Sequence, residues 1–250
     1  MKDGARVETI LKLLKKNYPH AQIILKYGNF WELLVAVILS AQCTDVMVNK
    51  VTERLFRKYP TLTDYVNADS KEFEQDIKST GFYHNKAKNI LVAARLIQEK
   101  FNGKIPMTME EMVTIPGVAR KTANVVLGNA YGIVEGIAVD THVLRLSQRL
   151  QLVDLDTIGG KKTVYFQKGN APQPPLKIRG GEGGVNSQFV DFKKDADPVK
   201  IEKQLMAVVP KADWFNLTYL LIDHGRATCR AQNPDCNHCI LKTICPSSRV

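Results

Sequence analysis

The sequence has no long apolar run. Its longest uninterrupted apolar stretch covers only residues 33–39, whereas a membrane-spanning helix needs about 20 residues. The first residues also lack the apolar core of a secretory signal, because Met1 leads through charged residues into an amphipathic stretch. Both absences argue against a membrane protein or an exported one, and we expect a monomeric protein of the cytoplasm.

Cysteine is scarce over most of the chain. Four of the five cysteines fall within the seventeen residues 229–245, in the spacing C-x6-C-x2-C-x5-C. Because disulfides are rare in a reducing cytosol, four clustered thiols predict a metal site. The single C-x2-C favours an iron–sulfur cluster over zinc, whose four-thiolate sites usually contain two separated C-x2-C pairs, but spacing alone leaves both metals open. The predicted ligands are Cys229, Cys236, Cys239 and Cys245.

Acidic residues are outnumbered by basic ones. The 25 Asp and Glu residues against 35 Lys and Arg residues leave a net charge of +10, with an isoelectric point near 9.3. Such a surplus on a folded chain favours a polyanionic partner, most often a nucleic acid. The charge fits a basic protein without such a partner equally well. The motifs must therefore decide between these two interpretations.

Alternating strand patterns are absent from most of the chain, and apolar residues recur at helical spacing instead. Asp69-x-x-Glu72 and Thr108-x-x-Glu111 are capping patterns that mark helix starts. These features predict an all-α fold. The expected helices are 6–16, 30–41, 46–59, 69–78, 84–101, a short helix from 108, 121–130, 141–150, 199–209 and 213–226.

Residues 156–197 depart from this pattern. They contain 7 of the 16 glycines and three prolines, a composition that buries too little apolar surface to offset the entropy of ordering. We expect an insertion that is disordered, or whose β-prone flanks, 163–167 and 188–192, pair as a two-stranded ribbon. Five basic residues and one acidic residue from 161 to 184 suggest a basic flap beside a nucleic acid.

Residues 115–119, Ile-Pro-Gly-Val-Ala, predict a tight turn between two helices. Backbone amides at the start of the second helix, together with its partial positive charge, can bind a phosphate oxygen without reading a base. On that helix the apolar stripe faces the core and Lys121 lies on the opposite side, beside small uncharged residues. This placement predicts a cleft lysine whose neutral amine is a nucleophile, with an ordinary surface lysine as the alternative.

Asp140 immediately precedes a predicted helix and has the residue type of an N-cap. Capping alone accounts for an aspartate at this position. A carboxylate held by the amides of its own helix also stays ionised, and it can stabilise positive charge on a substrate or accept a proton. Asp140 is therefore a second candidate catalytic residue.

Several motifs follow one another in a fixed order along the chain. They are LSAQCTD (39–45), GFYHNK (81–86), IPGVARKTANVV (115–126), VDTHV (139–143) and the four-cysteine segment. Together they resemble the endonuclease III family, the iron–sulfur type of helix-hairpin-helix DNA glycosylase, over essentially the whole chain apart from the insertion. The resemblance implies a bifunctional DNA glycosylase and AP lyase, which cuts at apurinic or apyrimidinic (AP) sites. Its partner would be nucleoid DNA that carries oxidised pyrimidines or abasic sites.

The resemblance also assigns roles to residues. Lys121 would form an imine with the sugar and nick the strand by β-elimination, with Asp140 as its carboxylate partner. Gln42 and Phe82 match the side chains that the family inserts into the duplex. The four cysteines would hold a [4Fe–4S] cluster. DNA contacts are implied for Ile115, Gly117, Ala119 and Arg120, and Ala119, which replaces a second glycine, is expected to loosen the approach to the phosphate.

Three alternatives differ in their requirements. Adenine-mismatch glycosylases of the same superfamily lack the nucleophilic lysine and carry a glutamate where this chain has Ala36, so Lys121 and Ala36 argue against that activity. A thymine-mismatch glycosylase stays open, since no motif identifies the residues of a base pocket. A non-catalytic DNA-binding module would not need both Lys121 and Asp140.

The resemblance implies two helical lobes. Residues 24–137 would form a six-helix barrel containing the helix-hairpin-helix motif at about 109–130. Residues 1–23 would join residues 138–250 in an iron–sulfur domain, which would carry the insertion at 156–197.

Overall fold

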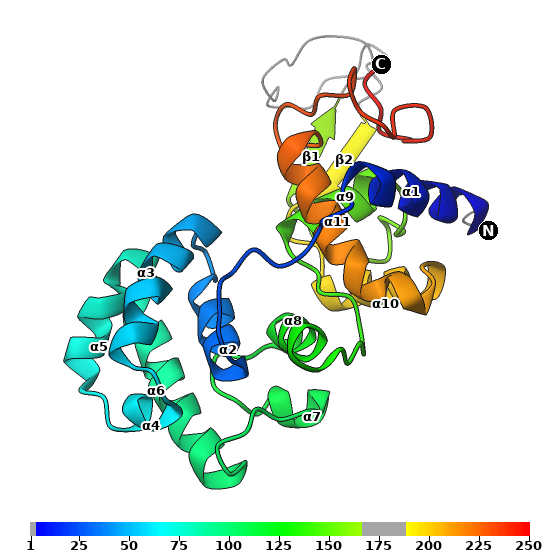
Figure 1. Cartoon of the computed structure of the whole chain (residues 1–250). Helices are drawn as coiled ribbons and strands as arrows, with labels where there is room; N and C mark the ends of the chain where they lie inside the picture. The colour runs from blue at the N-terminus through cyan, green and yellow to red at the C-terminus, as the bar shows by residue number, and fades with distance from the viewer. Residues whose placement is uncertain (1–3, 167–188) are drawn as a thin grey trace. The chain divides into compact units, whose positions relative to one another are not determined.

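The computed structural model describes residues 4–166 and 189–250 (Figure 1). These ranges are mostly helical, which confirms the all-α prediction. The chain divides into two compact units, one formed by Ile23–Glu135 and the other by Met1–Gln22 with Gly136–Val250. Each unit has its own hydrophobic core.

The unit Ile23–Glu135 is built around one apolar helix. This helix, α2, is buried at eight of its ten residues, because its sequence FWELLVAVIL is apolar nearly all round. It packs against α8, α3 and α6 (Figure 1). The elements of this unit are α2 (Phe30–Leu39), α3 (Asp45–Lys58), α4 (Leu62–Val66), α5 (Ser70–Ile77), the 3-10 turn η1 (Lys78–Thr80), α6 (Tyr83–Lys100), α7 (Met109–Met112) and α8 (Arg120–Tyr131).

Helix α4 is absent from the sequence-based prediction. It has five residues, too few for a periodic apolar pattern to be visible. What begins it is a capping box, in which the Thr61 side chain accepts from the Asp64 amide and the Asp64 carboxylate accepts from the Thr61 amide. The helix matters for packing because it contributes Tyr65, a fully buried side chain, to the core.

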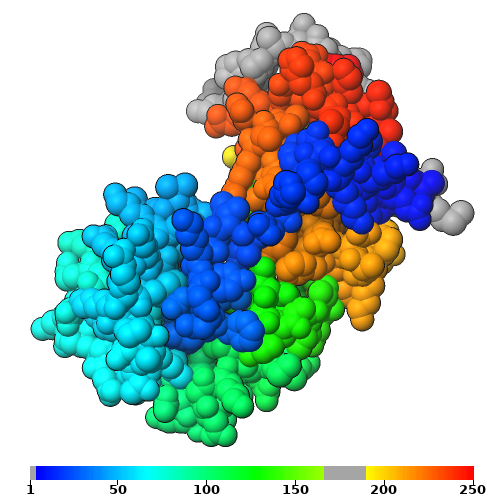
Figure 2. Space-filling model, in the orientation of Figure 1, coloured from blue at the N-terminus to red at the C-terminus, as the bar shows by residue number. Residues whose placement is uncertain are grey.

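The second unit joins the N-terminal helix to the C-terminal half of the chain. Helix α1 packs against α11, and α9 contacts α10, α11 and β2. Figure 2 shows the N-terminal helix in dark blue lying against the orange and red C-terminal segments. The elements are α1 (Gly4–Asn17), α9 (Thr141–Arg149), β1 (Thr163–Phe166), β2 (Phe189–Lys193), α10 (Pro198–Val208), the 3-10 turn η2 (Lys211–Asp213) and α11 (Trp214–Ala227).

The flanks of the expected insertion pair with each other. Strands β1 and β2 form an antiparallel ribbon, with a register irregularity between Val164 and Tyr165. Disorder of the whole segment, the other outcome expected from the sequence, is therefore wrong for these flanks. The proposed basic flap falls largely on residues 167–188, which lie outside the described residues.

Within residues 4–166 and 189–250, every helix is too short or too polar to cross a membrane. This agrees with the short apolar runs of the sequence.

The core of the unit Ile23–Glu135 contains a buried phenol that can be tested. The ring of Tyr65 packs against the rings of Trp31, Tyr59 and Phe73. Burial raises the pKa of Tyr65, and no described group lies within hydrogen-bond distance of its hydroxyl. The hydroxyl of Tyr59, in contrast, donates to Asp76 at 3.0 Å.

We therefore expect Tyr65→Phe to raise the free energy of unfolding by about 1 kcal/mol, because it removes a buried polar group without a partner. Tyr59→Phe is the matched control, and it should lower that free energy by about 1 kcal/mol, since it breaks a hydrogen bond to a carboxylate. Urea unfolding followed by circular dichroism measures both. A loss of stability in Tyr65→Phe would contradict the prediction.

Candidate functional site

The turn between α7 and α8 is closed by backbone hydrogen bonding. The amide of Val118 donates to the Ile115 carbonyl at 3.0 Å, and the side chain of Ile115 is buried. Gly117 has φ +82, in the left-handed region where a side chain is strained. A Cβ atom at Gly117 would also lie 3.1 Å from Cβ of Asn89. The turn thus requires glycine at 117, and the buried side chain of Ile115 packs it against the core.

Ala119 does not need to be glycine. Its φ of −94 and ψ of 171 are extended values that any residue adopts. The looser approach to a phosphate, which was expected from this alanine, stays a prediction. Ala119 is the N-cap of α8, and its side chain makes no capping hydrogen bond.

An uncapped helix start leaves amides without intrahelical partners. The first four N–H groups of any α-helix have no carbonyl to pair with inside the helix. In α8, the amide of Ala123 donates to the carbonyl of Ala119 at 2.9 Å. The N-terminus of α8 therefore presents oriented amides and a partial positive charge, the arrangement that binds phosphate.

Lys121 is exposed on the first turn of α8. The helix buries Ala123, Val126 and Leu127 against the core, as the apolar stripe predicts. Gly128, on the same side as Lys121, is also buried. The placement of Lys121 in a cleft, expected from the sequence, stays a prediction, since the side chain itself is exposed.

Asp140 is the N-cap of α9. One carboxylate oxygen, Oδ1, accepts from the amides of His142 and Val143, each at 2.8 Å. The other, Oδ2, lies 2.8 Å from Nδ1 of His142. A carboxylate can only accept, so Nδ1 of His142 carries the proton of this bond. Two backbone amides and the His142 ring thus hold a largely buried carboxylate in a fixed orientation.

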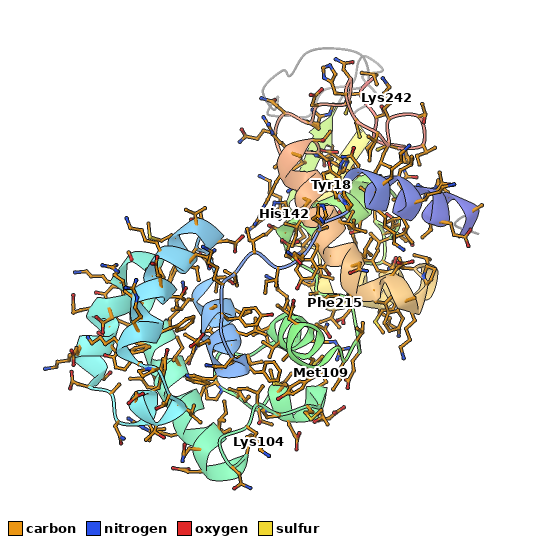
Figure 3. All side chains as sticks on the ribbon, in the orientation of Figure 1. Tyr18, Lys104, Met109, His142, Phe215 and Lys242 are labelled. Carbon is orange, nitrogen blue, oxygen red and sulfur yellow. The ribbon has the colours of Figure 1, made fainter. Side chains whose placement is uncertain are left out.

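His142, labelled in Figure 3, lies at the start of α9. Its ring contacts Asp140 through the hydrogen bond at Nδ1. The ring also packs against Gly225, because a Cβ atom at Gly225 would lie 2.8 Å from Cδ2 of His142. The two-residue separation of Asp140 and His142 was visible in the sequence, but the direction of the imidazole was not.

Gln42 and Phe82 occupy similar local geometries in the unit Ile23–Glu135. Gln42 has φ 52 and Phe82 has φ 49, both left-handed and unusual for residues with a side chain. Gln42 is exposed, and Phe82 keeps 64% of its surface in solvent. Left-handed residues other than glycine are uncommon, so each position is a candidate contact for a partner.

The four C-terminal cysteines line one pocket in the second unit. All four are free thiols of intermediate exposure. Burial raises the pKa of the Cys239 thiol and raises that of Cys245 to about 12. Thiolates here consequently require a cationic partner such as a metal.

The four thiols do not decide between the two metals that the spacing left open. Among the described residues, no group of three or more His, Cys, Asp or Glu side chains is arranged to hold a metal ion. A structural zinc ion takes all four sulfurs around one point, whereas a cubane cluster takes each thiolate on a different iron atom. The [4Fe–4S] cluster stays a prediction.

Arg149, at the end of α9, connects this cysteine loop to the ribbon. Its guanidinium donates to the sulfur of Cys229 at 3.3 Å and to the carbonyls of Arg230 and Ala231 at 2.7 and 2.8 Å. It also pairs with the Asp191 carboxylate of β2 at 2.9 and 2.6 Å. Both charged side chains are almost fully buried. Sequence reasoning missed this pair, because its two residues are separated by the insertion.

The candidate residues are divided between the units. Gln42, Phe82, the turn 115–119 and Lys121 belong to Ile23–Glu135. Asp140 and the four cysteines belong to the unit that contains Gly136–Val250.

Comparisons with known proteins agree on one family. Residues 35–164 match the model of the HhH-GPD superfamily, described as base excision DNA repair proteins. The chain is 45% identical to endonuclease III of Synechocystis sp., covering 98% of this chain and 94% of that protein. It is 40% identical to endonuclease III of Bacillus subtilis, covering 96% and 91%. A solved structure of a trapped covalent endonuclease III–DNA intermediate matches with a TM-score of 0.80 and 37% identity, covering 100% of this chain and 98% of that one.

The turn before α8 yields a stability prediction. Gly117→Ala should lower the free energy of unfolding by about 2–3 kcal/mol, because it combines left-handed strain with a collision against Asn89. Gly132, the C-cap of α8, is the matched control: its φ is also left-handed, at 67, but nothing lies within 4 Å of an added Cβ.

Gly132→Ala should therefore cost only the strain, about 1 kcal/mol. Thermal or urea unfolding of both variants measures the difference. Equal losses in the two variants would show that Asn89 does not crowd the turn.

Proposed function

Since the chain belongs to the HhH-GPD superfamily of base excision DNA repair proteins, we propose that it is a bifunctional DNA glycosylase and AP lyase acting on damaged duplex DNA. The observation that carries this proposal is an exposed lysine on the first turn of a helix whose N-cap residue, Ala119, makes no side-chain capping hydrogen bond. Relatives with 45% and 40% identity over nearly the whole chain are endonucleases III, and a structural neighbour is a covalent endonuclease III–DNA complex.

In the proposed reaction Lys121 is the nucleophile. Its neutral amine attacks C1′ of the damaged nucleotide while the bond from C1′ to the base breaks, and the base leaves with that electron pair and takes up a proton. Opening of the sugar ring gives an imine between Nζ and C1′. Loss of a proton from C2′ then expels the 3′ phosphate, which nicks the strand, and water finally hydrolyses the imine. The base must first leave the stack for C1′ to be reached.

Asp140 is the proposed carboxylate of the site. Positive charge develops on the sugar as the base departs, and an ionised carboxylate stabilises that charge. The same carboxylate can accept the proton that Lys121 must lose before it attacks. The hydrogen bonds from His142 and Val143 support this role, because they keep the group oriented and charged before the substrate arrives.

DNA binding is assigned to two features of the unit Ile23–Glu135. The amides around Gly117, Ala119 and Arg120 would contact a phosphate, a contact that positions the strand without reading sequence, while Ile115 supports the turn from the core. Gln42 and Phe82 would enter the base stack, filling the space of the displaced nucleotide. Oxidised pyrimidines and abasic sites in chromosomal DNA are the proposed substrates.

The four cysteines would hold a [4Fe–4S] cluster. Once bound, the cluster would supply four iron–sulfur bonds that cross-link residues 229–245, a segment with little apolar core of its own. The N–H groups that point at the sulfurs, from Arg149 to Cys229 and from the Leu241 amide to Cys239 at 3.4 Å, suit thiolates bound to iron.

The proposed chemistry predicts a covalent adduct. Borohydride reduction during reaction with a thymine-glycol duplex should join the protein to DNA, because it reduces the imine to a stable amine. Lys121→Ala should reduce this adduct to background, by at least about 1,000-fold. Lys100→Ala, which changes another exposed lysine of the same unit, is the control and should retain the adduct.

The same assay tests the substrate class and the alternatives. We expect more adduct with thymine glycol than with a G·T mismatch, and none with undamaged DNA. Stronger trapping on the mismatch would favour a thymine-mismatch glycosylase. DNA binding without any adduct would favour a non-catalytic module and contradict the proposal.

The cysteine pocket predicts an iron count. Protein purified without oxygen should carry about four iron atoms and about four acid-labile sulfides per chain. Cys239→Ser should lose most of the iron and much of its stability, since three thiolates remain. Cys43→Ser is the matched control and should keep the iron, because Cys43 lies in the other unit. Stoichiometric zinc in place of iron would contradict the assignment of an iron–sulfur cluster.

A further inference from the structure

A buried lysine lies within the apolar stripe of α6. Lys86 is only 5% exposed, although its neighbours on that face are apolar residues such as Ala87 and Ile90. Burial lowers the pKa of Lys86, since an ammonium group loses its hydration when covered. A buried charge of this kind is costly unless strong acceptors surround it, so its partners indicate what it does.

The Lys86 ammonium joins two separate chain segments. Nζ donates to the carbonyl of Leu39 and to the carbonyl of Thr80, each at 2.8 Å. Leu39 is the last residue of α2, and Thr80 is the last residue of η1. An ammonium on a flexible stem suits this task, because its tetrahedral donors reach acceptors in different directions.

Each of these segments leads directly into a strained residue. Leu39 is followed three positions later by Gln42, and Thr80 is followed two positions later by Phe82. Both of these residues have left-handed φ angles, 52 and 49. Backbone of this type persists only where surrounding contacts hold it. Lys86 supplies a shared contact at the base of both loops.

We propose that Lys86 is a positioning residue that fixes the loops of Gln42 and Phe82 relative to one another, so that both side chains can enter the same opened base stack. The inference rests on the proposed function, because it concerns how that function handles duplex DNA. Lys86 takes no part in the chemical step. It affects how Gln42 and Phe82 enter the duplex and leaves the amine of Lys121 unaffected.

The comparison of two DNA substrates separates this role from a general effect on folding. An abasic site in duplex DNA requires insertion into the stack, whereas an abasic site in single-stranded DNA does not. Both substrates use the same imine chemistry, and both can be trapped with borohydride. A fall in the amount of folded enzyme lowers both trapping rates equally, so their ratio reports on insertion alone.

Lys86→Met keeps the length of the side chain and removes its three donors. We expect the trapping rate on the duplex to fall about 10- to 100-fold, the effect of misplacing a group by about 1 Å, while the single-stranded rate changes by less than about twofold. Lys100→Met, on the last turn of the same helix and fully separate from both loops in sequence, should leave the ratio unchanged.

A double variant tests whether Lys86 acts through Phe82. If it does, Lys86→Met combined with Phe82→Ala should be little worse on the duplex than the more damaging single variant. Losses that multiply would show that Lys86 acts elsewhere. If Lys86→Met does not give folded protein, Lys86→Arg is the second variant, because it keeps the charge with a planar group of different shape. A fall in its ratio of duplex to single-stranded trapping rates would support the positioning role, and equal losses on both substrates would contradict it.

The outcomes distinguish the two proposals. Equal losses on duplex and single-stranded DNA would overturn the positioning role of Lys86 and leave the proposed function intact. A wild-type chain that forms no adduct with either substrate would overturn the proposed function itself.

Discussion

The candidate site depends on how two helices begin. Helix α9 has its first amides satisfied by the carboxylate of its own N-cap, Asp140. The N-cap of helix α8 is Ala119, whose side chain makes no capping hydrogen bond. A side-chain cap is worth about 1 kcal/mol. In the proposed function, a DNA phosphate would accept from amides at this helix start, beside the first-turn lysine.

Each unit also contains a buried basic side chain that donates to the backbone. Lys86 in one unit and Arg149 in the other each donate to backbone carbonyls. The acceptors of Lys86 at Leu39 and Thr80 are neutral carbonyls, whereas Arg149 also pairs with the Asp191 carboxylate. A buried ion pair adds little net stability over an apolar core, but it fixes geometry because breaking it is costly. Both residues lie beside segments that carry candidate site residues.

The fold was predictable from sequence where local patterns are strong. Helices α2 and α8 have apolar faces and turn residues at their ends, and both lie close to the expected ranges. The five-residue α4 carries too little pattern. Lys86 escaped notice because a lysine on an apolar stripe is assumed to be exposed, and its acceptors are 47 and 6 residues away. Family membership was correct, whereas the roles of Lys121 and Asp140 stay predictions.

Helix α9 links the proposed chemistry to the cysteine loop. It starts at the carboxylate of Asp140 and ends at Arg149, whose guanidinium holds the backbone of residues 229–231. Arg145, one turn earlier, donates to the Cys229 carbonyl at 3.0 Å. Because a short helix moves as a rigid body, ordering of the cysteine loop also fixes the direction of α9 and hence of its N-cap. In the proposed function, a metal at the cysteines would therefore hold the Asp140 carboxylate in place without contacting the substrate.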